Sequence, residues 1–363
     1  MHIKKIKIKN YRNYNEAEIS FHEKMNILYG DNAQGKTNIL ESIYICATTK
    51  SHQGSKDKEI IKMGCDEAHV KMYIEKEGLE HYIDLHLKKN KPKGIAVNGI
   101  PIKRSAELMG IINIVLFSPE DLNIIKNGPS ERRRFIDMEL CQLSRIYLDN
   151  LYRYSKVLNQ RNHLLKQLSY NESLKETLSV WDEQLIKYGT EIIKERKEFI
   201  EQINNISAEI HKKLTGEKEF LNIQYEPNVD AEEFADKLYK NYNRDIYYQI
   251  THTGPHRDDI KFISNDMDLR TYGSQGQKRT AALSLKLSEI EIVKKKTGDI
   301  PVLLLDDVLS ELDRSRQNYL LESIDDVQTI ITCTGLEEFI NHSLDVNRIY
   351  KIENGNVTDI EMR

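Results

Sequence analysis

Apolar and polar residues alternate in the first part of the chain. Ile3, Ile6 and Ile8 are separated by polar, mostly basic residues, and a period close to two is typical of a β-strand that buries one face. Similar spacings recur up to about residue 118. Asn98-Gly99 between two apolar runs predicts a tight hairpin, because both residues tolerate a positive φ. The pattern therefore predicts an antiparallel side sheet in this region.

The period changes to that of an α-helix between about residues 120 and 250. Apolar residues recur at intervals of three, four and seven over residues 147–168 and again over 181–210. The polar segment 169–173 lies between the two stretches and predicts a turn. We therefore expect two amphipathic helices that pack as an antiparallel hairpin and form an inserted arm.

A short apolar run at residues 25–29 is followed directly by the uninterrupted motif G-x-x-x-x-G-K-T and then by a helical pattern. Glycines let the loop backbone curl, so that successive N–H groups and the positive end of the helix point at one anion. The lysine of such a loop reaches the β- and γ-phosphates, and its threonine hydroxyl binds Mg²⁺. The motif therefore predicts a nucleotide phosphate site. Its expected residues are Gly30, Asp31, Asn32, Ala33, Gln34, Gly35, Lys36, Thr37 and Asn38.

A second apolar run, at residues 302–305, ends in two carboxylates. Four consecutive aliphatic residues predict a central parallel strand. We expect Asp306 to hold Mg²⁺ through its hydration shell and Asp307 to orient the attacking water. Lys36 completes the predicted catalytic set. Because these residues lie so far apart in the sequence, a whole domain must intervene between them.

The segment 274–277 opens a predicted helix that includes residues 281–293. Ser274 is a good N-cap, and an exposed helix N-terminus attracts anions, although ordinary capping explains the serine equally well. The order of phosphate loop, serine-glycine helix start and acidic strand resembles the ATP-binding-cassette arrangement. In that family, the serine segment of one subunit closes over the γ-phosphate of ATP bound by another. By this resemblance, the residues in that role are Ser274, Gln275, Gly276 and Gln277.

The first strand carries further candidate contacts to phosphate groups. Arg12 is expected to be a second phosphate ligand if the sheet folds back as in ATPase heads of the SMC type. The net charge of −4 does not indicate a general nucleic-acid binder, so any DNA contact must be local. A solvated charged face is the ordinary alternative. The candidate DNA ligands on this strand are Lys4, Lys5, Lys7 and Lys9.

The remaining composition limits the class of protein. No apolar run approaches the roughly 18 residues of a membrane span, and the N-terminal residues lack the pattern of a signal peptide. We therefore expect a soluble, cytoplasmic protein with no membrane partner. The four cysteines are widely scattered without a C-x-x-C pair, which indicates neither a disulfide framework nor a zinc site.

The chain resembles the RecF family of bacterial recombination-mediator ATPases over nearly its whole length. Beyond the phosphate loop, the resemblance rests on the segments 117–122, 128–137, 254–259 and 303–313. It implies an α/β fold with a cassette-type P-loop ATPase head, formed by residues 1–120 and 250–363, and a helical arm lobe over 121–249. It also implies ATP and Mg²⁺ as cofactors and weak, DNA-dependent ATP hydrolysis. The implied partners are a second copy of the chain, bound in the presence of ATP, duplex, gapped or junction DNA, RecR, RecO and RecA.

Three positions depart from the general cassette pattern. Ser118 stands where transporters carry a glutamine, Thr334 where they carry a switch histidine, and Asp307 where a glutamate is usual. Each change removes help for the attacking water, so we expect slow ATP turnover. A transporter-type ATPase subunit and a structural SMC-like ATPase are the alternatives. The missing glutamine and histidine disfavour the first, and the short arm without a C-x-x-C hook disfavours the second.

Overall fold

The computed structural model describes residues 1–168, 174–335 and 346–360. The chain divides into two compact units: unit 1 comprises Met1–Asp121 and Glu289–Arg363, and unit 2 comprises Leu122–Ser288. Residues 250–288, which the sequence pattern places with the head, therefore lie in unit 2. Helix α10 (Gln275–Thr297) begins in unit 2 and ends in unit 1.

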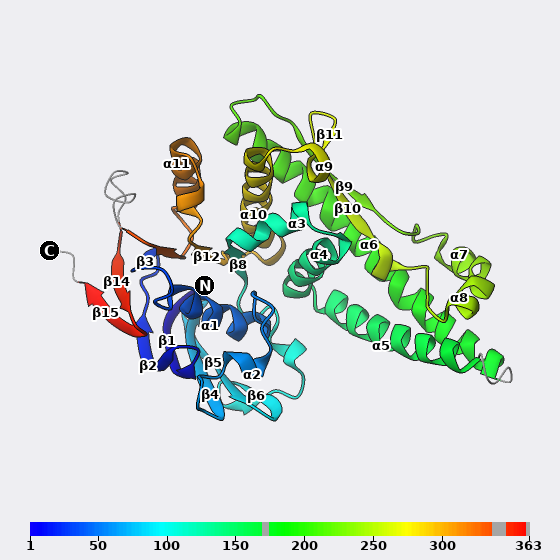
Figure 1. The fold of residues 1–363 in the computed structure, drawn as a ribbon, viewed down its shortest axis with the longest axis horizontal. Helices are drawn as coiled ribbons and strands as arrows, with labels where there is room; N and C mark the ends of the chain where they lie inside the picture. Colours follow the sequence, from blue (N-terminus) through cyan, green and yellow to red (C-terminus); the bar gives the residue numbers. More distant parts are fainter. Residues whose placement is uncertain (169–173, 336–345, 361–363) are drawn as a thin grey trace. The chain divides into compact units, whose positions relative to one another are not determined.

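A mixed sheet in unit 1 joins strands from both ends of the chain, in the order β15-β14-β3-β13-β12-β8 (Figure 1). Neighbours from β14 to β8 are parallel, and β15 is antiparallel to β14. Since parallel strands end at the same edge of a sheet, β3 and β12 finish one strand apart. The strands are β3 (Met25–Tyr29), β8 (Ile114–Phe117), β12 (Val302–Asp306), β13 (Thr329–Cys333), β14 (Arg348–Glu353) and β15 (Asn356–Ile360).

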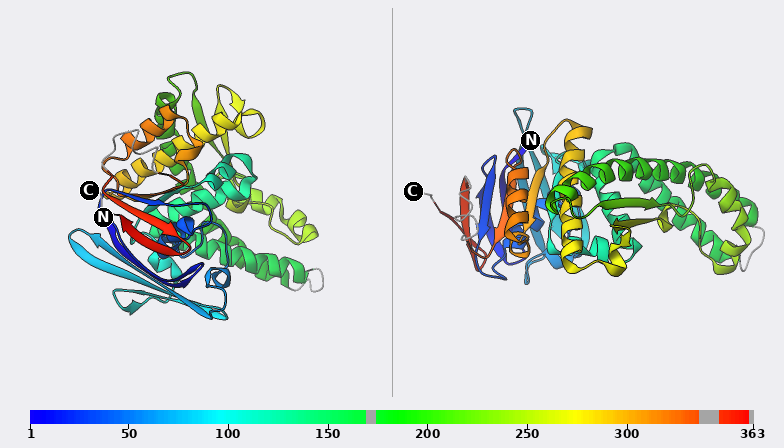
Figure 2. Two further views of the ribbon diagram at one scale, coloured as in Figure 1. Left: turned by 60° about the vertical axis from the view of Figure 1, so that its left-hand side comes forward. Right: turned by 90° about the horizontal axis from the view of Figure 1, so that it is seen from above.

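The second sheet of unit 1 is antiparallel, with the order β2-β1-β4-β5-β6-β7. Its strands are drawn in blue and cyan in Figure 2. The antiparallel side sheet predicted from the alternating pattern is therefore present. Asn98 and Gly99 form the turn between β6 and β7, with φ values of 51° and 78°. The strands are β1 (His2–Tyr11), β2 (Tyr14–Ser20), β4 (Glu67–Lys76), β5 (Leu79–Lys88), β6 (Lys91–Val97) and β7 (Ile100–Pro101).

One hydrophobic core connects both sheets of unit 1 with helix α1 (Lys36–Thr48). Ile6 and Ile8 from β1, Ile39 and Ile43 from α1, and Leu304 from β12 all belong to it. The first turn of α1 therefore has a fixed position relative to both sheets. Further elements of unit 1 are α2 (Asp57–Ile60), α11 (Arg314–Ser323) and the 3-10 turns η1 (Ser105–Leu108), η2 (Pro119–Asp121) and η5 (Leu309–Glu311).

Unit 2 contains the two long helices that the sequence predicts, α5 (Arg145–Leu168) and α6 (Lys175–Leu214). They pack side by side in Figures 1 and 2. The predicted turn at 169–173 lies outside the described residues. No helix in the described ranges is long and apolar enough to cross a membrane. The other helices of the unit are α3 (Leu122–Lys126), α4 (Pro129–Leu143), α7 (Phe234–Lys240), α8 (Tyr242–Tyr248), α9 (Leu269–Tyr272) and the 3-10 turn η4 (Pro255–Arg257).

A small antiparallel sheet accounts for the boundary of unit 2. Its order is β11-β10-β9, with β9 at Leu221–Glu226, β10 at Asp259–Ser264 and β11 at Met267–Asp268. Strand β10 pairs along its whole length with β9, which follows α6 directly. The segment after residue 250 is thus hydrogen-bonded to the arm region, and the sequence pattern alone did not reveal this pairing.

The arm helices bury charged groups as well as an apolar stripe. Arg161 on α5 is fully buried, and its guanidinium donates to Asp182 Oδ1 at 2.6 Å and to Asp245 Oδ2 at 2.7 Å. Burial raises the pKa of Asp182, and the neighbouring Arg161 opposes that rise. The three residues come from α5, α6 and α8, so this network fixes how these helices meet.

We expect Arg161→Leu to lower the free energy of unfolding by about 3–5 kcal/mol, because it leaves buried carboxylates without their cation. Urea unfolding followed by the fluorescence of Trp181, the only tryptophan, measures this in unit 2. The matched control is Arg153→Leu on the same helix, where the pair with Asp149 is exposed to solvent and should contribute little to stability. Equal effects of the two substitutions would contradict the structural role of Arg161.

Candidate nucleotide-binding site

The loop between β3 and α1 contains the G-x-x-x-x-G-K-T motif. Gly30 has φ 155°, and a Cβ there would lie 2.2 Å from the carbonyl oxygen of Ile352. Gly35 caps α1 with φ 114°, and a Cβ there would lie 2.5 Å from the side chain of Asn13. Both positions therefore require glycine. Lys36 spans the loop, since its Nζ donates to the carbonyl oxygens of Gly30 at 2.7 Å and Asp31 at 2.9 Å.

The acidic strand β12 ends beside the phosphate loop. Thr37 Oγ1 donates to Asp306 Oδ1 at 2.9 Å, and Thr332 Oγ1 donates to the same oxygen at 2.7 Å. Burial raises the pKa of the Asp306 carboxyl, and the bonds from Thr332 and Thr37 act against this rise. A hydroxyl and a carboxylate side by side are hard oxygen donors of the kind that Mg²⁺ prefers. The pair therefore suits a magnesium ion chemically.

Asp307 turns the chain away from the sheet directly after β12. Its φ is 53°, in the left-handed region that aspartate tolerates better than most residues. The backbone N–H of Asp307 donates to Thr332 Oγ1 at 2.9 Å, which holds this turn against β13. The side chain is half-buried. Asp307 thus follows the Mg²⁺ candidate Asp306 and keeps access to solvent.

Two residues that the sequence analysis missed support the loop from the turn between β1 and β2. Asn13 Nδ2 donates to the carbonyl oxygen of Gln34 at 2.9 Å, and Asn38 Nδ2 donates to Asn13 Oδ1 at 2.8 Å. The hydroxyl of Tyr14 donates to the carbonyl oxygen of Gly35 at 3.0 Å. The antiparallel sheet thereby contacts the phosphate loop directly. The sequence shows only a polar turn between two predicted strands, and this pattern does not indicate which part of the protein the turn contacts.

The turn between β14 and β15 supports the same loop from the other end of the chain. The N–H groups of Asn354 and Gly355 donate to the side chain and backbone oxygens of Gln34, at 2.6 and 3.2 Å. Gly30 N–H donates to the carbonyl oxygen of Cys333 at the end of β13. Four chain segments therefore contact the loop: the turn before β2, the end of β12, the end of β13 and the turn after β14. The last three are remote from the loop in the sequence.

Arg12 binds a carboxylate in the structure. Its Nε and Nη2 donate to the two oxygens of Glu41 at 2.8 and 2.6 Å, and Nη2 also donates to Ser55 Oγ. Glu41 is fully buried on α1. Burial acts to raise the pKa of Glu41, but hydrogen bonds from Arg12 and Ser51 bring it below its ordinary value. A role of Arg12 at the phosphates stays a prediction.

The serine segment forms a reciprocal capping box at the start of α10, within unit 2. Ser274 Oγ accepts from Gln277 N–H at 3.2 Å, and Gln277 Oε1 accepts from Ser274 N–H at 2.9 Å. Ordinary capping therefore describes the local geometry. Ser274, Gln275 and Gly276 are exposed, so this helix start is accessible to another molecule. Its proposed contact with a γ-phosphate stays a prediction.

The predicted DNA ligands on β1 face acidic side chains. Lys5 and Lys7 both bind Glu18 on β2, at 2.7 and 2.8 Å. Lys4 lies at an irregularity of β1 and binds Glu75 at 3.1 Å. These pairs reduce the net positive charge of the face. DNA binding by Lys4, Lys5, Lys7 and Lys9 therefore stays a prediction.

The comparisons with known proteins decide the family. A family model described as RecF/RecN/SMC N terminal domain matches residues 2–358. The DNA replication and repair protein RecF of Lachnoclostridium phytofermentans is 62% identical over 357 residues, which cover 98% of this chain and 99% of that protein. The chain belongs to the RecF family. RecF of Clostridium tetani is 46% identical over 364 residues, with 98% and 99% covered.

Solved structures agree with the RecF assignment. A structure of the recombination mediator RecF-ATP in the RecFOR pathway has a TM-score of 0.93 and 37% identity, and the match covers 99% of this chain and 98% of that one. An Smc head domain from Pyrococcus furiosus, at 18% identity and a TM-score of 0.58, covering 99% of this chain and 96% of that one, shares the fold alone. The α/β head of cassette type predicted from the sequence is thereby confirmed, and the transporter alternative is not favoured.

We expect Asn13→Ala to weaken ATP binding by roughly tenfold, or about 1.4 kcal/mol, because the loop loses two supporting hydrogen bonds. Titration calorimetry with ATP measures this change. Asn347→Ala is the matched control, since Asn347 accepts one bond from Met25 N–H at the opposite end of β3. Unchanged ATP affinity in Asn13→Ala would remove this turn from the support of the loop.

Proposed function

We propose that this RecF-family chain is an ATP-dependent DNA-binding protein of recombinational repair and replication restart. ATP binding drives two copies together on duplex or gapped DNA, and slow hydrolysis releases them. The observation that carries this proposal is the 2.9 Å bond between Thr37 and Asp306, which joins the phosphate loop to the acidic strand. The similarity to a RecF structure described with ATP supports the choice of nucleotide.

The loop is built to bind a nucleoside triphosphate with Mg²⁺. Lys36 supplies a positive charge beside the loop carbonyls, where the β- and γ-phosphates would lie. Thr37 and Asp306 are the residues that would hold Mg²⁺, which when bound would neutralise charge on the phosphates. The raised pKa of Asp306 supports this assignment, because a buried carboxylate gains from a nearby cation.

Hydrolysis depends on Asp307 in this proposal. Its carboxylate would orient water toward the γ-phosphate, and Asp306 would remain committed to the metal. Asp307 is one methylene shorter than the usual glutamate. Ser118 stands where transporters carry a glutamine. Its N–H and its hydroxyl both donate to Asp121 Oδ2, at 2.7 and 3.4 Å, within its own turn. With little help for the attacking water, turnover is slow and ATP acts as a timer for assembly.

Asp307→Asn is expected to reduce ATP hydrolysis by roughly 100-fold or more, because an amide cannot accept the proton of water. Asparagine tolerates the left-handed φ of 53°, so the backbone should not change. Phosphate release under saturating ATP measures hydrolysis, and calorimetry checks that ATP still binds. Glu311→Gln is the control and should hydrolyse at the normal rate. If Asp307→Asn turns over normally and Glu311→Gln does not, the roles are reversed.

The dimer would be closed by the exposed start of α10. Ser274 and Gly276 belong to unit 2 and are exposed at the start of the helix, where backbone N–H groups have no partner within the helix itself. Such a helix start suits the γ-phosphate of ATP bound to a second copy. The start of α10 would make dimerisation depend on ATP. Without ATP in the phosphate loop of one copy, the start of α10 in the other copy has no phosphate to bind.

Ser274→Arg is expected to abolish the ATP-dependent dimer while the monomer still binds ATP, because the larger cation occupies the space of the partner's phosphate. Sedimentation with ADP and with ATP measures assembly, and ATP-stimulated affinity for duplex DNA should be lost with it. Ser130→Arg is the control, since Ser130 is an exposed serine in the first turn of α4. Normal dimers of Ser274→Arg in ATP would exclude this interface.

The proposed partners follow from the family. The RecF structures similar to this chain are described as part of the RecFOR pathway, which supports RecR and RecO as partners. In this proposal, RecA is the protein that they load at single-strand gaps. We assign the chain to the cytoplasm, where chromosomal DNA lies. For the lysines of β1, DNA phosphates would have to displace Glu18 and Glu75, so contacts there are weaker than the lysine count indicates.

A further inference from the structure

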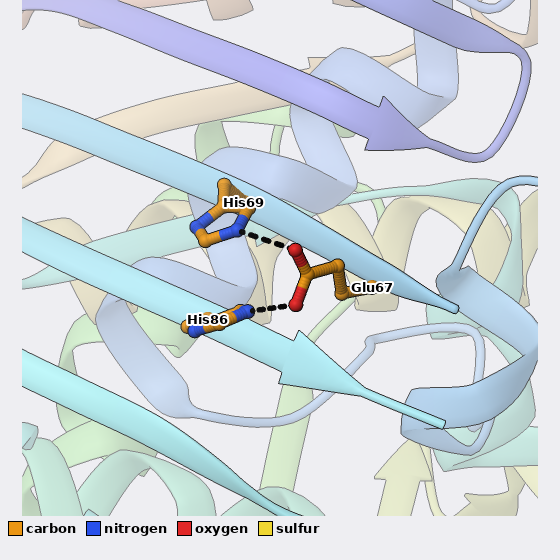
Figure 3. Close-up of side chains that lie close together, drawn as sticks. All are labelled: Glu67, His69 and His86. Atoms are coloured by element: carbon orange, nitrogen blue, oxygen red, sulfur yellow. Dashed lines mark hydrogen bonds and ion pairs between the residues drawn. The ribbon is translucent and has the colours of Figure 1, made fainter. Parts of the chain in front are cut away.

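A second group of convergent polar side chains lies on the solvent-facing side of the antiparallel sheet. His69 on β4 and His86 on β5 are direct partners in the strand register, and Glu67 precedes His69 by two residues on the same face. The imidazole rings are stacked, with centroids 3.8 Å apart and planes 25° apart. Figure 3 shows both rings turned toward the Glu67 carboxylate.

Both imidazole rings approach the carboxylate of Glu67. His86 Nε2 lies 2.9 Å from Glu67 Oε2, and His69 Nε2 lies 3.8 Å from Glu67 Oε1. One ligand atom from each of the three residues falls within 4.8 Å of the other two. Two atoms bound to one zinc ion at about 2.0–2.2 Å lie roughly 3–3.5 Å apart, so small side-chain rotations would complete the approach.

We propose that Glu67, His69 and His86 form a zinc-binding site that links β4 to β5. Two imidazole nitrogens and one carboxylate oxygen are a ligand set that zinc uses in proteins, with water in the fourth position. Mg²⁺ prefers oxygen ligands in an octahedron and does not suit this set. The Cα positions are fixed by the sheet, so binding needs only rotations of partly exposed side chains.

The surrounding charges set the strength of the site. Lys88 lies opposite Glu67 in the register and Lys9 lies opposite His69, and both ammonium groups oppose a bound cation. Asp84 lies on the same face of β5 as His86 and favours the cation. We therefore expect weaker binding than at closed cysteine-rich zinc sites. The bound ion would stabilise the folded sheet, because the unfolded chain does not hold the three ligands together.

The test uses the full chain, stripped of metal by a chelator and without nucleotide, because ATP itself binds divalent ions. Calorimetry with Zn²⁺ should show one site that is lost or weakened by at least roughly 10- to 100-fold in Glu67→Gln, His69→Ala and His86→Ala. Added Zn²⁺ should raise the melting temperature of the unaltered chain but not of the His69→Ala, His86→Ala double variant. With Co²⁺ in place of Zn²⁺, the visible absorption of a tetrahedral complex should appear and depend on the same residues.

His81→Ala is the matched control. His81 lies on β5, as His86 does, but its ring contacts Asn98 and not the cluster. It should bind Zn²⁺ as the unaltered chain does. Calorimetry with ATP in each variant checks that unit 1 remains folded. If the unaltered chain takes up no Zn²⁺, or if the three ligand variants bind it normally, the cluster is only a surface ion pair and the proposal is overturned.

Discussion

The hydrogen bond between Thr37 and Asp306 sets the strictest requirement on this fold. It forms only if β3 and β12 lie in one parallel sheet with β13 between them, in a register that ends both strands at the same edge. The two residues come from nearly opposite ends of the chain. The phosphate site is therefore complete only after β12 and β13 have paired into the sheet with β3, the strand before the loop. Because this pairing joins distant parts of the chain, we expect it to form late in folding.

The loop itself depends on contacts that a local motif does not contain. Gln34 accepts hydrogen bonds from Asn13, Asn354 and Gly355, which belong to two hairpin turns of two different sheets. A glycine-rich loop is flexible by itself, since glycine loses more backbone entropy on ordering than other residues. The two turns offset that loss by fixing the loop before any ligand arrives, which is the usual structural meaning of preorganisation.

Features set by neighbours in the sequence were predictable, and features set by tertiary pairing were not. The Asn98-Gly99 hairpin, the alternating β1 and the two arm helices follow from local periods and turn residues, and the structure has them. The support of the loop by Asn13 was not predictable, because nothing in the turn indicates what it will contact. The compact unit extends to Ser288, past the expected boundary at 250, because β10 pairs with β9, and this pairing is not visible in the sequence.

Arg12 shows how a charged residue can have a partner that its sequence context does not indicate. The sequence places it near the phosphates, and the structure gives it the buried Glu41. A phosphate ligand of Arg12 would have to compete with Glu41 for the same guanidinium. Removing it from Glu41 without compensation would cost about 3–5 kcal/mol by the usual measure for a broken buried pair. Tyr11 and Ser51 also donate to Glu41 and would lower that cost. A phosphate chain can therefore attract Arg12 only if its own charge outweighs that of one carboxylate held by two hydroxyls, so the residue would distinguish between phosphate ligands by their charge.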